Sequence, residues 1–160
     1  MELRKIKIYL DTSVLSYLEQ IDAPYKTAET LELWDVFRTR DDVEILISNI
    51  ALEEFSETKE PKRSRVLDLI GTLAYKRIQE TDEHRRLAQV YLDANVLTGK
   101  SFEDLRHIAV AVSYGCKYIV SWNFKHFVNP KTIDAVNAVS LANNLPQIQI
   151  LSPSMLLGGF

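Results

Sequence analysis

Short apolar segments with the pattern of β-strands alternate with longer segments of helical periodicity, and this alternation constrains the fold more than any other feature. The predicted strands cover residues 6–10 (IKIYL), 43–48 (VEILIS), 117–122 (KYIVSW) and 148–151 (IQIL). The predicted helices cover residues 13–20, 27–39, about 50–58, 62–76, 82–97, 102–114 and 132–144. Strands joined through helices usually run parallel, because the crossover returns the chain to the same end of the sheet. The sequence therefore predicts an α/β fold with three α/β/α layers around a mostly parallel sheet.

The composition favours one globular domain. The 160 residues are 46% hydrophobic and 26% charged, which is enough apolar material for one sizeable core. Pro61, Gly115 and Pro130 fall between predicted helices and neighbouring segments, where such residues commonly interrupt regular structure. No internal repeat or low-complexity linker divides the chain. We therefore expect residues 1–160 to form a single domain.

The charge and the cysteine content limit what the protein could bind and in which compartment it could work. Nineteen Lys and Arg against twenty-two Asp and Glu give a net charge of −3, so nucleic acid could bind only at a local basic patch. Cys116 is the single cysteine and cannot form an internal disulfide, and the start MELRKIKIYL lacks the apolar core of a signal peptide. No apolar run approaches the roughly 20 residues that cross a bilayer. A cytoplasmic protein without membrane insertion is expected.

Asp11 directly follows the first predicted strand, within IYLDTSVLSYL (8–18). In an open parallel sheet, ligands bind at the carboxyl ends of the strands, which makes Asp11 a candidate ligand. An N-cap is an equally good interpretation, because Asp11, Thr12 or Ser13 could each accept a hydrogen bond from a free amide of the following helix.

A pair of carboxylates follows the second predicted strand, in ISNIALEEF (47–55). Ser48 is a predicted helix cap, and Glu53 and Glu54 lie in the first turns of the helix, where they could also interact favourably with its dipole. Adjacent helical residues point about 100° apart, so only one of the two should face the strand end that Asp11 occupies. Periodicity does not decide between them.

The third candidate segment is SFEDLRHIAVAVSYG (101–115). Ser101 and Asp104 have the spacing of a capping box, with Asp in place of the usual Glu or Gln. Asp104, His107 and Ala111 share one helical face beside an apolar stripe, which also makes Asp104 a candidate functional carboxylate. A histidine in such a place is more often a hydrogen-bonded, partly buried residue than a ligand.

Ser121 and Asn123 follow the third predicted strand and could reach the same edge of the sheet, although Asn is also common in turns. Carboxylates that converge from separate segments repel one another unless a cation neutralises them. A site built only of oxygen ligands suits Mg²⁺ or Mn²⁺ and not zinc.

Together these segments resemble the PIN-domain ribonucleases, the family that includes VapC-type toxins of toxin–antitoxin pairs. The resemblance rests on YLDTSVL, ISNIALEEF, DLRHIAVAVSYGCKYIVSWN and KHF, in the order and approximate spacing of the family. It runs from about Ile6 to Phe127, with a weaker similarity in IQILSPSMLL. The resemblance implies a PIN-like fold and a Mg²⁺- or Mn²⁺-dependent endoribonuclease that leaves 5′-phosphate and 3′-hydroxyl ends. It also implies an RNA substrate, a small antitoxin partner and a homodimer.

The acidic positions of the family map onto Asp11, Glu54 and Asp104 as catalytic metal ligands, with Glu53 as the alternative for the second. The fourth acidic position, usually Asp, falls on Asn123, which could orient water or act as a neutral ligand. Supporting roles are assigned by the same resemblance to the hydroxyls Thr12 and Ser121 and to His107.

Contacts with RNA would need positive charge near this acidic site. The run KEPKRSR supplies Lys59, Lys62, Arg63 and Arg65 shortly after Glu54, and such side chains bind phosphates without reading sequence. A solvated helix start is the more common explanation of such a run. Lys125 and His126, beside Asn123, are further candidates, whereas Trp122 is expected to pack in the interior.

Three other functions fit less well. A haloacid-dehalogenase-like phosphatase would need Asp-x-Asp after the first strand, but residue 13 is Ser. A dinucleotide-binding fold would need a glycine-rich first turn, and DTSVLS contains no glycine. A non-catalytic interaction module with a weakened metal centre is supported by Asn123 alone and opposed by the three carboxylates.

Overall fold

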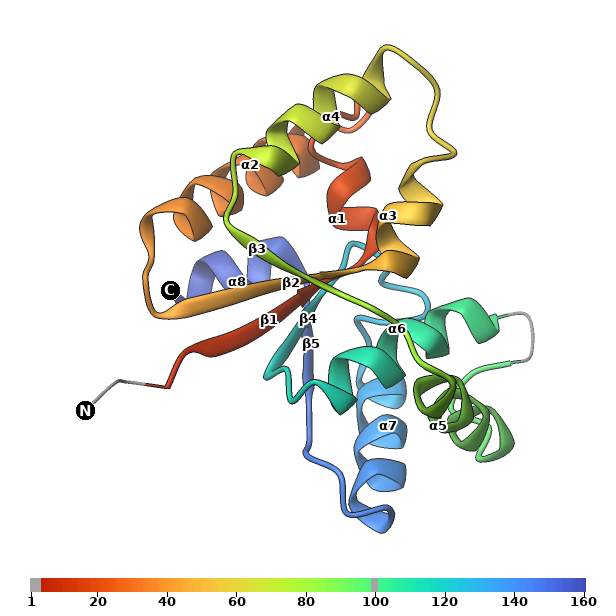
Figure 1. Ribbon diagram of the computed structural model, residues 1–160. Helices are drawn as coiled ribbons and strands as arrows, with labels where there is room; N and C mark the ends of the chain where they lie inside the picture. The colour runs from red at the N-terminus through yellow and green to blue at the C-terminus, as the bar shows by residue number, and fades with distance from the viewer. Residues whose placement is uncertain (1–3, 99–100) are drawn as a thin grey trace.

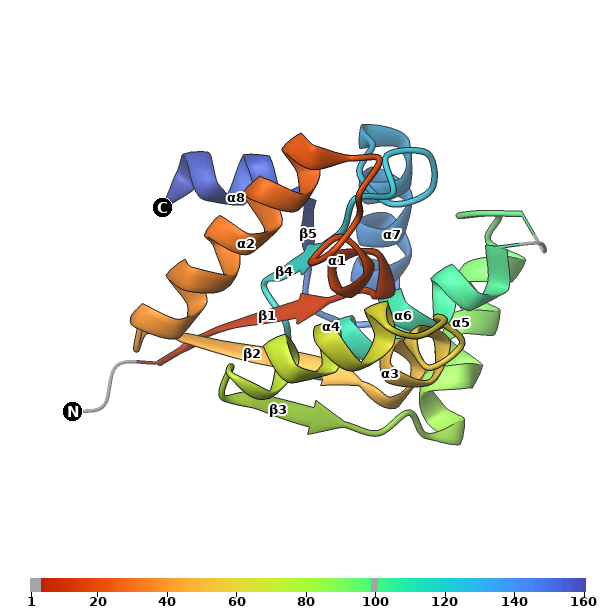
Figure 2. The same ribbon diagram turned by 90° about the horizontal axis from the view of Figure 1, so that it is seen from above.

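A computed structural model describes residues 4–98 and 101–160 and shows a parallel sheet covered by helices on both faces (Figures 1 and 2). The strands in this part of the chain are β1 (Ile6–Leu10), β2 (Val43–Ser48), β3 (Tyr75–Ile78), β4 (Tyr118–Val120) and β5 (Gln149–Leu151). The helices are α1 (Thr12–Ser16), α2 (Pro24–Thr39), α3 (Asn49–Phe55), α4 (Lys62–Gly71), α5 (Asp82–Asp93), α6 (Phe102–Ser113), α7 (Pro130–Ala142) and α8 (Pro153–Gly159).

The strand order is β3-β2-β1-β4-β5, and every pair of neighbours is parallel. The central strand β1 pairs Ile8 with Ile45 of β2 and Leu10 with Val120 of β4. This confirms the predicted three-layer α/β/α fold. Because the strands are parallel, the segments that follow β1, β2 and β4 leave the sheet at the same edge.

Two elements differ from the sequence-based expectation. Residues 62–76 were expected to form one helix, but α4 ends at Gly71 and the chain then forms the edge strand β3. Lys76 and Arg77 are exposed in this strand, so its sequence lacks the apolar run that would have indicated it. The helix α8 was not expected either, although Ser152 caps it by accepting a hydrogen bond from the Met155 amide.

Several helix ends also differ from their predicted positions. Helices α2 and α7 begin at Pro24 and Pro130, earlier than the expected residues 27 and 132. Proline is favoured in the first turn of a helix, where no amide hydrogen is needed, so these prolines start the helices instead of preceding them. Helix α1 is shorter than the expected 13–20, and α5 ends before Asn95, whose φ of 58° is left-handed.

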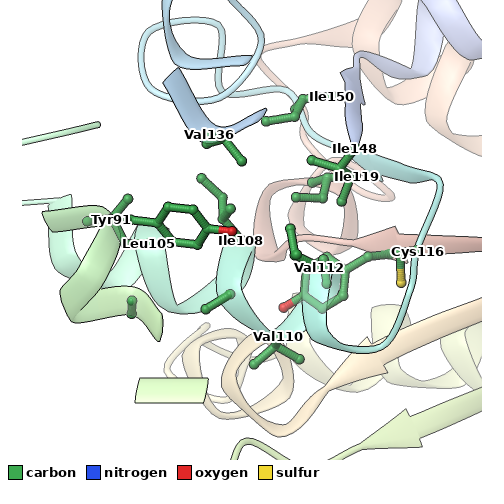
Figure 3. Packing of buried hydrophobic residues seen from close by; sticks show 14 of the residues in the cluster. Tyr91, Leu105, Ile108, Val110, Val112, Cys116, Ile119, Val136, Ile148 and Ile150 are labelled. Carbon is green, nitrogen blue, oxygen red and sulfur yellow. The ribbon is translucent and has the colours of Figure 1, made fainter. Parts of the chain in front are cut away.

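Side chains of β1 alternate between two apolar cores, one on each face of the sheet. Ile8 and Leu10 pack with α1, α2, α4 and α8, whereas Tyr9 packs with α5, α6 and α7. Figure 3 shows the second core, in which side chains of α5, α6 and α7 converge on those of β4 and β5. Helix α6 is the most buried helix of this face and contributes residues from Leu105 to Val112.

An ion pair fixes α6 against its neighbours. The side chain of Glu80 is 2% exposed and accepts hydrogen bonds from Arg106 of α6 at 2.6 and 2.7 Å and from Arg85 of α5 at 3.0 Å. Burial acts to raise the pKa of Glu80, but the hydrogen bonds from the two arginines outweigh it and leave the pKa below its ordinary value. The Glu80 amide also donates to Asn49 of α3 at 2.8 Å, so one residue connects α3, α5 and α6.

No helix within residues 4–98 and 101–160 has both the length and the apolar character needed to cross a membrane.

Candidate active site

A small pocket of about 180 Å³ opens at the edge of the sheet where β1, β2 and β4 end. Its lining residues come from four parts of the chain: Asp11, Thr12, Ser13, Glu54, Asp104, His107, Asn123 and Phe127. The structure therefore brings together all four residues that the sequence proposed as catalytic. It also places Glu54, and not Glu53, in the pocket lining. Other pockets in the described residues are larger, but one has a single carboxylate, Glu19, and in another Asp41, Asp42 and Glu44 come from one short segment and share the pocket with Arg4, Lys5 and Lys7.

Asp11 is held by three hydrogen bonds at the end of β1. Its Oδ1 accepts from Ser13 Oγ at 2.6 Å and from the Val14 amide at 3.2 Å, and its Oδ2 accepts from Ser121 Oγ at 2.5 Å. The Val14 bond makes Asp11 the N-cap of α1, so Asp11 both caps the helix and lines the pocket. The side chain is almost fully buried, and burial raises the pKa of Asp11 despite these hydrogen bonds.

Glu54 reaches the pocket because Ser48 fixes where α3 begins. Ser48 accepts a hydrogen bond from the Ala51 amide at 3.2 Å and thereby caps α3, as predicted. From this start, Glu54 points toward α6 and its Oε1 lies 2.7 Å from His107 Nε2. Glu53 instead accepts a hydrogen bond from Asn49 on its own helix at 3.3 Å. Periodicity left open which of the two glutamates faces the pocket. The Ser48 cap favours Glu54, because it fixes the residue at which α3 begins.

A buried chain of hydrogen bonds supports Glu54 from behind. Tyr9 of β1 is fully buried, and its hydroxyl lies 2.7 Å from Ser48 Oγ and 2.5 Å from His107 Nδ1. The chain therefore runs from the cap of α3 through Tyr9 and His107 to Glu54 on the same helix. It closes a loop between β1, α3 and α6, which fixes Glu54 relative to Asp11.

The available donors and acceptors determine which group donates in each hydrogen bond of this buried network. Burial acts to raise the pKa of Glu54, but the hydrogen bond and charge of His107, with Thr12 and Arg106, together outweigh it and leave the pKa below its ordinary value, so Glu54 is an ionised acceptor at neutral pH. His107 Nε2 must then donate to Glu54. All bonds are satisfied when Tyr9 donates to His107 Nδ1 and Ser48 donates to Tyr9. Sequence reasoning missed Tyr9, because its position in an apolar strand indicates packing alone.

Asp104 and Asn123 are connected through His126. Asp104 Oδ2 lies 2.7 Å from His126 Nδ1, and Asn123 Oδ1 accepts a hydrogen bond from the His126 amide at 2.9 Å. The predicted capping box of Ser101 and Asp104 is wrong, since the Ser101 side chain makes no capping hydrogen bond to α6. Ser101 has φ −105° and ψ 20°, which is not the extended backbone of a typical N-cap. The Asp104 carboxylate is thereby available to the pocket.

Three polar groups in the pocket keep binding capacity. The buried Thr12 Oγ1 has no hydrogen-bond partner among residues 4–98 and 101–160, although it lies close enough to Glu54 to help lower its pKa. Glu54 uses Oε1 and Asp104 uses Oδ2 for their histidine partners, and their other carboxylate oxygens accept no hydrogen bond from the described residues. A buried hydroxyl without a partner is rare in proteins, which indicates that a ligand or water completes this pocket.

The oxygen groups of the pocket fit a hydrated divalent ion. Within the described residues, no three Asp, Glu, His or Cys side chains converge closely enough to hold one ion directly. Mg²⁺ does not need such a cage, because it keeps several waters and commonly takes only one or two carboxylates. A volume of about 180 Å³ corresponds to roughly six waters at about 30 Å³ each, which is enough for a partly hydrated ion.

The predicted RNA-binding run lies outside the pocket lining and is largely engaged by its neighbours. Lys62 donates to Gln20 at 2.6 Å, Arg63 lies 3.4 Å from Glu60, and Arg65 lies 2.6 Å from Glu19. Lys59 and Lys125 are exposed, and Lys125 is close in sequence to Asn123 of the pocket. The role of these five residues in binding RNA stays a prediction.

Replacing Tyr9 with Phe tests the buried chain. The change removes the hydroxyl that joins Ser48 to His107 and leaves the Ser48 hydroxyl hydrogen and His107 Nδ1 without their partner, so we expect the free energy of unfolding to fall by about 2 kcal/mol. Tyr91→Phe is a matched control, because Tyr91 is equally buried but its hydroxyl contacts only Ser140, at 2.8 Å. Its expected loss is about 1 kcal/mol. Equal losses of unfolding free energy for the two variants in urea denaturation would contradict the buried chain of hydrogen bonds.

Comparisons with known proteins agree with this architecture. No protein-family model matches the sequence, and no curated protein sequence matches it either. Among solved structures, VapC20 from Mycobacterium tuberculosis, described as a sarcin-ricin loop cleaving toxin, aligns with a TM-score of 0.58 and 15% identity over 74% of this chain and 92% of VapC20. VapBC2 from Rickettsia felis, solved bound to a DNA fragment from its promoter, aligns with a TM-score of 0.58 and 16% identity over 92% of this chain and 98% of that chain. The chain therefore has a VapC-like PIN-domain fold, as the sequence predicted.

Proposed function

We propose that this chain, which has the PIN-domain fold, is an endoribonuclease that hydrolyses RNA phosphodiester bonds with the help of a bound Mg²⁺ or Mn²⁺. The observation that carries the proposal is the convergence of Asp11, Glu54 and Asp104 on one small pocket at the carboxyl edge of the sheet. The likeness to VapC20, described as a toxin that cleaves the sarcin-ricin loop, adds support for RNA as the substrate class.

The electrostatics of the pocket support a metal-dependent reaction. A phosphodiester is an anion, and carboxylates alone would repel it at contact distance. Asp11, Glu54 and Asp104 would hold the ion, which supplies charge neutralisation, polarisation of the phosphate and a bound water of lowered pKa. A hydrated ion fits the volume and the free carboxylate oxygens described above.

The protein groups of the pocket are arranged before substrate binds. Asp11 is fixed by Ser13, Ser121 and the Val14 amide, and Glu54 is fixed by His107. Groups held in this way need little rearrangement during the reaction, which lowers its barrier. We assign the free Thr12 hydroxyl to a phosphate oxygen or to the attacking water, because it is a buried donor that faces the pocket.

Incubation of the purified protein with single-stranded and hairpin RNAs tests this function. We expect cleavage with Mg²⁺ or Mn²⁺, none with EDTA, and recovery when Mn²⁺ is added in excess of the chelator. The products should carry 5′-phosphate and 3′-hydroxyl ends, because a metal-activated water, and not the ribose 2′-hydroxyl, attacks phosphorus. Cleavage that survives EDTA, or products with cyclic phosphate ends, would contradict the proposal.

A protein partner is a second expectation. The VapBC2 structure, whose alignment covers nearly all of that chain, supports a toxin–antitoxin assembly for proteins of this fold. Ile21 and Tyr25 are 91% and 86% exposed, beside a groove lined by Leu18, Pro24 and Leu31. Exposed apolar surface of this kind is typical of protein contacts. We propose that a small antitoxin or a second copy of the chain covers it.

A further inference from the structure

Trp122 and Phe124 flank the pocket-lining residue Asn123 in sequence and belong to a group of aromatic rings around one lysine, which we call the aromatic cluster: Tyr17, Lys26, Trp122 and Phe124. Lys26 Nζ lies 5.3 Å from the ring centre of Tyr17, 5.5 Å from that of Trp122 and 5.8 Å from that of Phe124. In the part of the chain that the structure describes, Lys26 forms no salt bridge. Its charge is therefore not neutralised by a carboxylate, unlike those of Arg63 and Arg65.

The cluster is physically joined to the pocket. Trp122 is 6% exposed, and its Nε1 donates to Thr30 at 2.8 Å, so it is packed in the interior as predicted. The Trp122 amide donates to Ser13 Oγ at 2.9 Å, and the same hydroxyl donates to Asp11 at 2.6 Å. Two hydrogen bonds through Ser13 thus connect the backbone of Trp122 in the cluster to the Asp11 carboxylate of the pocket.

Phe124 is the exposed member of the cluster. It lies next to Asn123 of the pocket lining, its side chain is 48% exposed, and its ring is centred 6.2 Å from that of Trp122. The Phe124 ring is therefore supported by Trp122 and Lys26 while about half of the residue stays open to solvent. The loop that carries it also presents the exposed Lys125, and Figure 2 shows this loop beside the first turn of α2, which carries Lys26.

We propose that Phe124 stacks on an unpaired base of RNA next to the cleaved bond, while Lys26 and Lys125 contact the flanking phosphates. This inference rests on the proposed ribonuclease function and names where its substrate binds. Aromatic rings combined with unpaired cations are the typical means of binding single-stranded nucleic acid, because every base has a flat face. A base-paired strand hides its faces, so the site selects unpaired nucleotides.

Binding without cleavage tests the proposal directly. The anisotropy of a short labelled single-stranded RNA is measured in EDTA, so that affinity is read without metal-dependent turnover. We expect Phe124→Ala and Phe124→Leu to weaken binding at least about fivefold, since neither offers a flat ring, and Phe124→Trp to retain it. Leucine keeps the apolar packing on Trp122, which separates loss of stacking from a disturbed loop. Lys26→Met should reduce the slope of log affinity against log salt concentration by roughly 0.7, because one phosphate contact is lost.

Phe160→Ala is the matched control. Phe160 is 39% exposed and has Arg40 over its ring at 4.2 Å, but Arg40 precedes β2 and lies at the opposite edge of the sheet. We expect its affinity for RNA to equal that of the unaltered protein. Equal affinities for Phe124→Leu and Phe160→Ala, or no binding of single-stranded RNA either in EDTA or with Mg²⁺ present, would overturn the inference. If RNA binds through Phe124 but no metal supports cleavage, the binding site stands and the proposed catalytic function fails.

Discussion

Asp11→Asn is expected to lower the rate of RNA cleavage at least about 100-fold while the protein remains folded. Asparagine has nearly the same volume and is also a good N-cap, so it can keep the hydrogen bond with the Val14 amide. What it removes is the negative charge at the centre of the pocket. Loss of a group that only supports a metal ligand commonly costs 10- to 100-fold, so loss of the ligand charge should cost more.

The same variant should be at least as stable as the unaltered protein when no metal is present. Asp11 is buried with hydroxyl and amide partners, no cation of residues 4–98 or 101–160 lies within salt-bridge distance, and burial raises its pKa. A buried carboxylate without a cation costs stability, which the neutral amide avoids. Cleavage rates and thermal unfolding in EDTA measure the two effects. Asp82→Asn, at the exposed start of α5, serves as the control and should change neither. An Asp11→Asn variant that cleaves normally would remove Asp11 from the site.

Substitution of Glu54 is expected to have the second large effect on cleavage, and substitution of its neighbour Glu53 is the matched control. Glu54→Gln is expected to lower cleavage roughly 100-fold and to weaken Mn²⁺ binding, because it removes a charge that lines the pocket. Its amide oxygen can still accept the hydrogen bond from His107, so the buried chain persists. Glu53→Gln changes the same atoms one residue earlier, outside the pocket lining, and should change neither quantity measurably. Calorimetric titration with Mn²⁺ of both variants measures the difference, and equal effects would show that the phase of α3 is wrong.

The position of the candidate site was predictable from the sequence because it follows from sheet topology. Alternating strands and helices require parallel strands, and parallel strands place Asp11 and Asn123 at the same edge. Periodicity did not decide between Glu53 and Glu54; the family resemblance favoured Glu54, and the helix start that the Ser48 cap sets places Glu54 in the pocket lining. Periodicity alone leaves such adjacent residues undecided.

Contacts between distant segments account for most of what the sequence could not predict. Tyr9 meets Ser48 and His107 across separations of 39 and 98 residues, so nothing local marks its hydroxyl as functional. Asp104 was predicted as a metal ligand, with a local capping box as the alternative, but its partner His126, which lies on another loop, was not predicted. The edge strand β3 was missed because a strand covered on one side only, with Lys76 and Arg77 exposed, needs few apolar residues.

The central place of β1 in the sheet has a consequence for motion. Exposing its backbone amides to solvent requires both β2 and β4 to separate from it, so these amides open only with a large part of the protein. The loop that carries Asn123 and Phe124 lies outside the sheet and can open locally at much lower free energy. The carboxylate at the end of β1 is thus anchored to a segment that opens only with much of the protein, while Phe124 and Lys125 lie on a loop outside the sheet. Such a division lets the loop adjust to a bound strand of RNA without moving Asp11.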